Sequence, residues 1–431
     1  MPDCGRIAVQ QTSASLAHVR VGVRRETVGP ALHHRGMTQG SSAISSGSPS
    51  SGSQSSSLLS SGQPAVDPPP SDESAAGVAT EQLSRAELEE RLAGYRGELT
   101  GYCYRMLGSP FEAEDAVQDT MVRAWRALDR FEGRSSLRTW LYRIATNVCT
   151  DALAGRTRRA RPVDLTGPSA PTDAVPAPLP EATWVLPAPD AAVLSGGAAG
   201  GPIDPADQAV ARESVRLALV VALQRLAPRQ RAVLILREVL GWPAAETAQL
   251  LDTTVASVNS ALQRARATLA ASDVTASDPL RPADDQQRDL LARYVTAFES
   301  YDMTALTALL RDDATLTMPP LEMWMRGPQD IVGFMLGHGA VCRDSRLVPS
   351  LANGSPAFGQ YHRAAPGEAE LRAAVTGSEV RPLPAEALDG GYVPWSLIVI
   401  DVTDGKIAGL HHFLDTDRLF PLFGLPPYLP A

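Results

Sequence analysis

Apolar residues recur at helical spacing in two stretches of residues 109–153. The first stretch opens with Ser109, Pro110 and Glu112, which suit the N-cap and the first and third positions of a helix. Its apolar face is formed by Val117, Met121, Ala124 and Leu128. After a break at residues 131–133, the pattern predicts a second helix over Leu137–Leu153 that is rich in arginine and aromatic residues.

A second helical block lies between residues 215 and 269. It predicts an amphipathic helix that stops before Pro228 and another over Arg229–Leu240, ending at Gly241. Two further helices, Ala244–Leu251 and Val255–Leu269, are separated by the short turn 252–254. Their apolar residues are spaced for packing across a tight turn, which is the pattern of a helix-turn-helix; a generic helical hairpin is the alternative.

The pattern changes after residue 284, where helices come first and strands follow. We expect helices at Leu290–Ser300, Met303–Leu310 and Pro328–Leu336, and strands at Ala314–Met318, Trp395–Val402 and Lys406–Leu414. The last two strands form a hairpin that turns at Asp404 and Gly405. The fold class is therefore two all-α domains followed by an α+β domain.

Composition and charge divide the 431 residues into five parts. Residues 1–80 include a tract with 13 serines in 21 positions and are expected to be disordered, and Met37 is an alternative start. Residues 81–161 and 210–272 are predicted domains; net charge is +4 over 95–161 and +4 over 210–272. An acidic linker rich in proline and alanine, 162–209, joins them, and the domain 284–431 has a net charge of −8. Two basic domains joined by a linker indicate a protein that contacts one polyanion at two places.

Several classes of protein are excluded or disfavoured. The chain contains no run of eighteen apolar residues and no apolar signal core, which argues against a membrane span and against secretion. Cys4, Cys103, Cys149 and Cys342 are far apart and form no metal-binding or disulfide pattern, so a cytoplasmic protein is expected. No phosphate loop or nucleophile elbow occurs, and we expect neither a cofactor nor a metal.

Residues 102–153 (YCYRMLGSPFEAEDAVQDTMVRAWRALDRFEGRSSLRTWLYRIATNVCTDAL) resemble region two of the sigma-70 family in its extracytoplasmic-function (ECF) form. The resemblance implies that Asp115, Gln118 and Asp119 bind the clamp helices of the RNA polymerase beta-prime subunit. It also implies seven residues that contact the melted minus-ten element: Phe131, Arg134, Arg138, Trp140, Arg143, Asn147 and Asp151. Arginine neutralises phosphate and aromatic rings hold unstacked bases, so the residue types suit promoter melting. Core packing of Trp140 remains the alternative.

Residues 223–269 (LQRLAPRQRAVLILREVLGWPAAETAQLLDTTVASVNSALQRARATL) resemble region four of the same family, with no region three between. The resemblance makes Val255–Leu269 the recognition helix for the minus-35 element. The residues expected at DNA are Thr254, Ser257, Asn259, Ser260, Gln263, Arg264 and Arg266. Asparagine and glutamine suit adenine, and arginine suits guanine, whereas Thr254, Ser257 and Arg266 suit phosphates. Arg229 and Arg231 are assigned to DNA or to the polymerase beta flap without a choice between them.

The motifs at 293–320 (RYVTAFESYDMTALTALLRDDATLTMPP), 323–335 (MWMRGPQDIVGFM) and 406–417 (KIAGLHHFLDTD) resemble a SnoaL-like domain of the NTF2-like superfamily. This resemblance implies a cone-shaped curved sheet with a pocket. The pocket candidates are Trp324, Tyr361, His411, His412 and Asp415. Because neighbouring residues of a strand point to opposite faces, at most one of the two histidines lines the pocket. Ordinary sheet and interface roles are the alternative for all five.

The order of the three parts resembles actinobacterial ECF sigma factors of the sigma-G and sigma-J kind, which carry a fused SnoaL-like domain. The segment 179–187 (LPEATWVLP) resembles their linker motif and suggests a docking role for Trp184. The resemblance implies a non-enzymatic sigma factor that binds core RNA polymerase and promoter DNA, with the C-terminal domain modulating it. A small-molecule ligand and an anti-sigma protein are further candidate partners. The alternatives are a DNA-targeted enzyme with a cyclase-like catalytic domain and a simple helix-turn-helix repressor.

Overall fold

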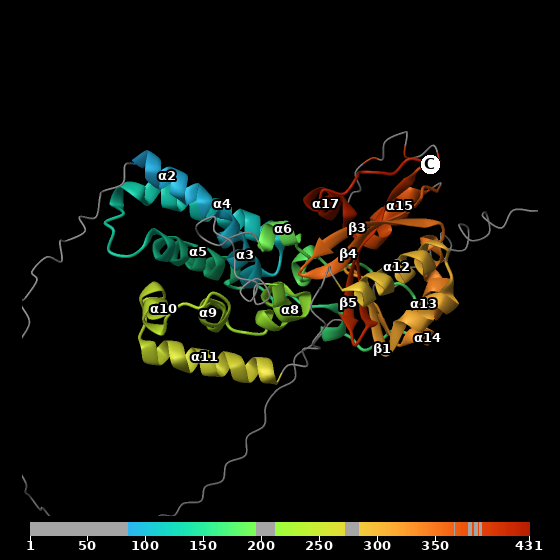
Figure 1. Cartoon of the computed structure of the whole chain (residues 1–431), viewed down its shortest axis with the longest axis horizontal. Coiled ribbons are helices and arrows are strands. Elements are labelled where there is room, and N and C mark those ends of the chain that lie inside the picture. Colours follow the sequence, from blue (N-terminus) through green and yellow to red (C-terminus); the bar gives the residue numbers. More distant parts are fainter. Residues whose placement is uncertain are drawn as a thin grey trace, which may run out of the picture. The chain divides into compact units, whose positions relative to one another are not determined.

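The computed structural model describes residues 85–194, 212–271, 284–365, 367–377, 382, 387 and 390–431. The segment 1–80, with Met37, and the second part of the linker, 195–209, lie outside the described residues. Figure 1 shows an N-terminal helical domain (85–153), a helix-turn-helix domain (212–271) and a C-terminal domain built on a sheet (284–431). The predicted fold class, two helical domains and an α+β domain, is confirmed.

The N-terminal helical domain consists of helices α2 (Arg85–Gly94), α3 (Arg96–Leu107), α4 (Pro110–Ala127) and α5 (Leu137–Leu153). Helix α4 begins where the sequence predicts, because the Ser109 hydroxyl accepts a hydrogen bond from the Glu112 backbone N–H. Helix α5 likewise begins after Ser136, whose hydroxyl accepts from the Thr139 backbone N–H at 3.1 Å. The starts of both predicted helices are therefore explained by their N-caps.

The helix-turn-helix domain consists of α8 (Leu217–Gln224), α9 (Pro228–Leu234), α10 (Ala244–Leu250) and α11 (Val255–Ala270). The predicted turn is present: Asp252 has a positive φ of 50°, and the Thr254 hydroxyl caps α11 by accepting from the Ser257 backbone N–H at 3.1 Å. Beyond Leu234 the predicted α-helix continues as a π-helical turn, Ile235–Val239. Helix α8 is buried along most of its length rather than amphipathic, because neighbouring parts of the chain cover it.

The C-terminal domain has a mixed sheet in the order β2-β1-β6-β5-β4-β3, in which only β1 and β6 are parallel among the described strands. The strands are β1 (Leu310–Thr317), β2 (Trp324–Arg326), β3 (Ser345–Ala352), β4 (Ser355–Arg363), β5 (Tyr392–Thr403) and β6 (Lys406–Phe413). The helices are α12 (Asp285–Glu299), α13 (Met303–Leu309), α14 (Pro328–Leu336), α15 (Glu368–Thr376) and α17 (Thr416–Leu422). Sequence reasoning found β1, β5 and β6 and missed β2, β3 and β4.

Both faces of this sheet are apolar. On one face, Ile398 and Ile400 of β5 share a core with residues of helices α12, α13 and α14. On the other face, Leu397 and Val399 belong to an apolar cluster that continues through Trp184 into both helical domains. The two faces of one central strand therefore contribute to two different cores.

The described part of the linker is extended but packed. It contains short turns at Pro162–Asp164 and Glu181–Thr183 and one helical turn, α6 (Asp190–Val193). Trp184 is 1% exposed, and Val185 and Leu186 beside it are also buried. Residues 162–194 have little regular structure, but the part around Trp184 is a buried strip rather than a free tether.

Asn353 joins all three domains and the linker. It lies with Gly354 in the two-residue β3–β4 turn, and both residues have positive φ values of 57° and 67°. Its side chain is fully buried. The carboxamide oxygen accepts from the Ala188 N–H at 2.9 Å, and Nδ2 donates to the Tyr104 hydroxyl at 2.7 Å and to the Val215 carbonyl at 2.6 Å.

We expect Asn353→Gly to lower the free energy of unfolding of the full chain by about 3 kcal/mol, because it leaves buried polar groups without partners while keeping the positive φ. The matched control is Asp404→Gly, since Asp404 also has a positive φ in a hairpin turn but has an exposed side chain. Urea unfolding of both variants measures the difference. Equal midpoints for the two variants would contradict the role of Asn353.

Candidate nucleic-acid interface

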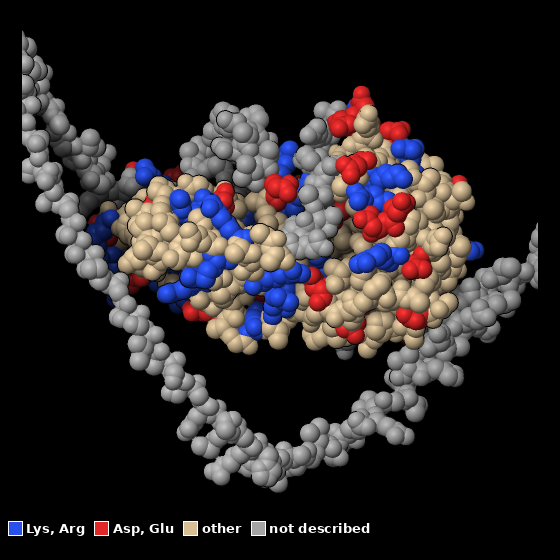
Figure 2. All heavy atoms as spheres, turned by 90° about the horizontal axis from the view of Figure 1, so that it is seen from below, with Lys and Arg blue, Asp and Glu red and all other residues tan. Residues whose placement is uncertain are grey.

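Helix α11 presents a polar face to solvent. All seven residues predicted at the minus-35 element are exposed: Thr254, Ser257, Asn259, Ser260, Gln263, Arg264 and Arg266. The helix is held from its other side by Val258, Leu262 and Ala265, which are buried. Figure 2, which views the molecule from the side on which α11 lies in Figure 1, shows basic side chains gathered over the half formed by the helical domains.

Three of these seven residues also have side-chain partners within the chain: the Thr254 hydroxyl donates to the Ser257 hydroxyl at 3.2 Å, and Arg266 pairs with Glu238. The Thr254 hydroxyl caps the helix, so its contact with a phosphate would add to an existing hydrogen bond. Arg266 donates to the Glu238 carboxylate at 2.5 Å, but this ion pair is exposed and therefore contributes little. The base-reading candidates Asn259, Ser260, Gln263 and Arg264 are all exposed.

The seven residues predicted at the minus-ten element fall into three groups. Arg134, Asn147 and Asp151 are exposed on the loop before α5 and on α5 itself. Phe131 and Trp140 are half-buried and pack against each other with ring centroids 5.1 Å apart. Trp140 is thus neither a core residue nor a fully exposed one.

The other two predicted minus-ten residues, Arg138 and Arg143, contact the helix-turn-helix domain. The Arg138 guanidinium lies 4.8 Å from the Trp242 ring centroid, and its Nε donates to Glu98 at 2.7 Å. Arg143 donates to the Gln249 carbonyl at 2.6 Å. We call this packing of α5 against Trp242 and α10 the closed arrangement.

A third contact of the closed arrangement lies between the two arginines. The Thr139 hydroxyl donates to the Glu246 carboxylate of α10 at 2.7 Å. Thr139 is buried although it belongs to the helix expected to face melted DNA. One face of α5 is therefore occupied by the helix-turn-helix domain.

Helix α4 has an exposed face that combines acidic and apolar side chains. Asp115 and Gln118 are exposed, and Asp119 pairs with Arg123 at 2.8 Å. Val122 and Trp125 extend the same face and are 39% and 53% exposed. Sequence reasoning missed these two; the signal was available, because both residues lie off the apolar stripe that contains Val117 and Ala124.

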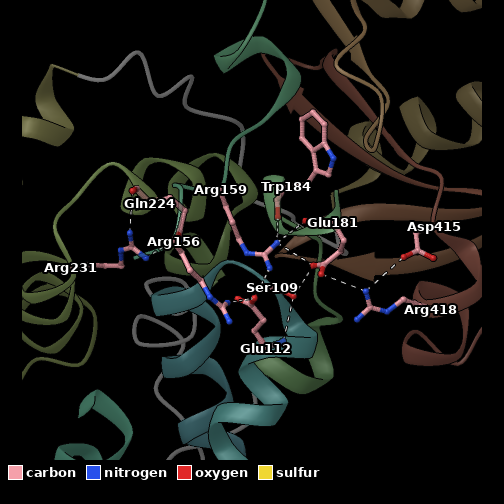
Figure 3. A network of polar contacts seen from close by, with 10 residues as sticks. All are labelled: Ser109, Glu112, Arg156, Arg159, Glu181, Trp184, Gln224, Arg231, Asp415 and Arg418. Atoms are coloured by element: carbon pink, nitrogen blue, oxygen red, sulfur yellow. Dashed lines mark hydrogen bonds and ion pairs between the residues drawn. The ribbon is translucent and has the colours of Figure 1, made fainter. Parts of the chain in front are cut away.

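A polar network links α4, the linker and the C-terminal domain (Figure 3). Arg159 is buried and contacts Glu112 at 2.9 Å and the Glu181 carboxylate at 3.1 Å, and it also donates to the Trp184 carbonyl. Arg418 of α17 lies 3.6 Å from Glu181. Arg159 therefore fixes the strip that carries Trp184.

Arg231 is a buried residue that stabilises the packing of the domains. It is 4% exposed and donates to the Gln224 side chain at 2.6 Å and to the Met106 carbonyl of the N-terminal helical domain. Burial lowers the pKa of its guanidinium to about 10. The expectation that Arg231 reaches DNA or the polymerase flap is corrected on this ground, whereas Arg229 is exposed.

The C-terminal domain and Val175 of the linker line an apolar cavity of about 60 Å³. Of the five predicted pocket residues, His412 lines this cavity and the other four do not. His411 points to the opposite face of β6 and pairs with Asp401 at 2.9 Å, as the alternation of the strand requires. The remaining predictions were wrong for this cavity: Trp324 donates to the Thr166 carbonyl and Tyr361 to the Pro426 carbonyl.

Asp415, the fifth pocket candidate, follows β6 and faces Arg418 at 4.0 Å, outside the cavity. Burial raises the pKa of its carboxyl group. Within the described part of the chain no cluster of His, Cys, Asp and Glu is arranged to hold a metal ion. In the same part, every helix is too short or too polar to cross a membrane.

Comparisons with known proteins match both helical domains. Residues 92–159 match the model of sigma-70 region 2, and residues 216–269 match the model of sigma-70 region 4. The chain is 42% identical over 348 residues to the ECF RNA polymerase sigma factor SigG of Mycobacterium tuberculosis, covering 80% of this chain and 85% of that protein.

SigJ of the same organism is 27% identical over 333 residues, with 75% of this chain and 90% of that protein covered. The crystal structure of SigJ covers 80% of this chain and 100% of the SigJ chain at 24% identity, with a TM-score of 0.46. On the strength of the match to SigG and of the two region models, the chain belongs to the ECF RNA polymerase sigma factors.

Proposed function

We propose that this sigma factor reads the minus-35 element with α11 and the minus-ten element with α5 and the loop before it. The observation that carries the proposal is the exposed polar face of α11, because asparagine, glutamine and arginine stand there at positions that one groove can accept together. Asn259 and Gln263 suit adenine and Arg264 suits guanine. Ser260 lies beside them as a further base-edge candidate, whereas Thr254, Ser257 and Arg266 suit backbone contacts that fix the register.

Because the chain belongs to the ECF RNA polymerase sigma factors, we expect core RNA polymerase to be its partner. We place the contact with the clamp helices of the beta-prime subunit on α4, through Asp115, Gln118 and Asp119, extended by Val122 and Trp125. A mixed acidic and apolar face of this kind suits a protein interface better than a nucleic acid, because carboxylates repel phosphates. Arg229 is the remaining candidate for the beta flap.

The closed arrangement is consistent with a resting form of the protein, in which part of the proposed DNA-binding surface is used for internal contacts. Arg138 and Arg143 would have to leave Trp242 and Gln249 before they could contact melted DNA. Asn353, Arg159 and Arg231 hold the domains together in the same arrangement. We therefore propose that opening of the closed arrangement precedes promoter recognition, and that the C-terminal domain sets the cost of opening. Because the chain covers its own surface, such control needs no separate anti-sigma protein.

The C-terminal cavity supports binding rather than catalysis, which disfavours the cyclase-like alternative. Its titratable lining residues among the described ones are His412 and Cys342. Burial lowers the pKa of His412 to about 3 and raises the pKa of Cys342 to about 11. Neither group changes its protonation near neutral pH, so neither suits general acid–base catalysis there.

The test of promoter recognition compares the variants Arg264→Ala and Arg266→Ala in run-off transcription with bacterial core polymerase. The template is the DNA upstream of the gene that encodes this chain. We expect Arg264→Ala to weaken promoter binding by about 1–3 kcal/mol and to relax the sequence preference at one base pair. Arg266→Ala should instead lower affinity for all sequences alike and reduce the salt dependence by about one counterion. An unchanged base preference in Arg264→Ala would argue against the assignment.

The test of the resting form uses Arg159→Ala, with Arg158→Ala as a control that removes the same charge from an exposed neighbour. Loss of Arg159 leaves Glu112 and Glu181 without their common partner, and we expect the linker strip to loosen by about 2 kcal/mol. Limited proteolysis within 162–194 should become faster, and transcription at limiting core polymerase should rise. If both variants are cut at the wild-type rate, Arg159 does not hold the strip.

A further inference from the structure

His412 lines the apolar cavity, and its Nε2 is a buried hydrogen-bonding atom that has no partner among the described residues. Apart from His412 the cavity is lined by apolar side chains and Cys342, including Met318, Met323, Met335 and Trp395. His412 itself is 4% exposed. A buried polar atom in an apolar cavity indicates a missing hydrogen-bond partner.

A chain of hydrogen bonds behind His412 determines what that partner must be. The Cys342 carbonyl can only accept, so the Ser345 hydroxyl donates to it, at 2.7 Å. Ser345 must then accept from the Gln360 amide NH₂, at 3.1 Å, which turns the Gln360 carbonyl oxygen toward Ser396. Ser396 donates its one hydrogen to that oxygen at 2.7 Å.

Ser396 can therefore only accept from His412, whose Nδ1 lies 3.1 Å away and must carry the proton. Burial keeps the imidazole neutral, because it lowers the pKa of His412 to about 3. A neutral ring with a proton on Nδ1 has a lone pair on Nε2. The unpartnered atom of this cavity-lining residue is thus a hydrogen-bond acceptor, and its partner must be a donor.

A water molecule fits this position poorly. Buried waters usually make about three hydrogen bonds, whereas this cavity offers His412 Nε2 among carbon and sulfur atoms. A hydroxyl group attached to an apolar body satisfies the acceptor and fills the rest of the space. The chemistry of the cavity therefore selects an apolar molecule with one hydroxyl donor.

The linker forms one wall of the cavity. Val175 lines it and lies between two backbone contacts of the linker with the C-terminal domain. Ser169 N–H donates to the Trp324 carbonyl at 2.7 Å, and Leu179 N–H donates to the Pro320 carbonyl at 2.9 Å. The same strip reaches Glu181 and Trp184, which Arg159 holds.

We propose that the cavity is a binding site for a small apolar alcohol or phenol, and that this ligand competes with Val175 for the space beneath the linker. A cavity of about 60 Å³ is smaller than the roughly 150 Å³ that accommodates benzene, so even a single ring must displace Val175 or the methionines. Displacement of the linker loosens the strip around Trp184. This regulatory consequence rests on the proposed function, whereas the binding site does not.

The test uses the full chain with methyl-labelled methionine, because Met318, Met323 and Met335 report on the cavity, and titrates it with phenol and with toluene. Phenol and toluene have nearly the same shape, but phenol carries the donor. We expect saturable shifts of these methyl signals and roughly 3- to 10-fold tighter binding of phenol, the effect of one hydrogen bond. His412→Leu should remove this preference while toluene still binds.

Variants of the linker test the competition. Val175→Ala should tighten the binding of both probes by about fourfold, because less apolar surface has to be displaced. Val175→Trp should abolish binding, and the matched control Ala177→Trp, at an exposed position of the same segment, should leave it unchanged. Equal binding to Val175→Trp and Ala177→Trp would overturn the role of the linker.

Two further outcomes would overturn the site itself: no saturation with either probe in wild-type and Val175→Ala chains, or equal dissociation constants for phenol and toluene in the wild type. Should His412→Leu fail to fold, the ring ¹⁵N shifts of His412 in the wild-type chain replace it; Nε2 must shift with phenol and stay unchanged with toluene. No polymerase takes part in these measurements. A failed titration therefore leaves the proposed function standing, and failed transcription leaves the titration valid.

Discussion

The fold depends on covering a sheet that is apolar on both sides. Helices α12, α13 and α14 cover one face, and the other face joins the apolar cluster of α17, the linker strip and the two helical domains. Asn353 stands at the end of this second face and supplies the polar contacts that burial would otherwise leave unmade. The arrangement of the domains therefore follows from two needs. Water must be excluded from that face, and the polar groups of the buried β3–β4 turn must find hydrogen-bond partners.

This constraint has a functional consequence, since it brings the helix-turn-helix domain against α5. Arg138 and Arg143, which suit melted DNA, are used for internal contacts instead. Any partner that opens the chain must bind the open form more tightly by the free energy of these contacts. A shift from 1% to 99% open requires about 5.5 kcal/mol of differential affinity, which a polymerase interface can supply. The acidic face of α4 remains exposed in the closed arrangement, so the proposed contact with the polymerase there does not require opening.

The local signals in the sequence predicted the helices well, because capping residues are short-range features. Ser109 and Thr254 stand directly before the helices that they cap, and both starts were found. The β3–β4 hairpin was missed although Asn353 and Gly354 form a typical two-residue turn, since Pro349, Pro356 and Gly359 break the alternation of the two strands.

The alternation of β6 correctly predicted that at most one of His411 and His412 lines the cavity. It could not choose between them, because that choice depends on which face the helices cover. Burial of Trp184 and the use of Arg138 within the chain depend on tertiary packing and cannot be derived from spacing.

The central claim is that α5 must separate from α10 before transcription starts. The most direct measurement joins the two helices with a short, reducible bis-methanethiosulfonate crosslinker between cysteines introduced by Thr139→Cys and Glu246→Cys, in a chain that also carries Cys4→Ser. Cys103, Cys149 and Cys342 are buried and should not compete for the reagent. Run-off transcription with core polymerase is then compared before and after reduction. We expect the crosslinked chain to give no specific transcript and reduction to restore transcription. Full activity of the crosslinked chain would contradict the account.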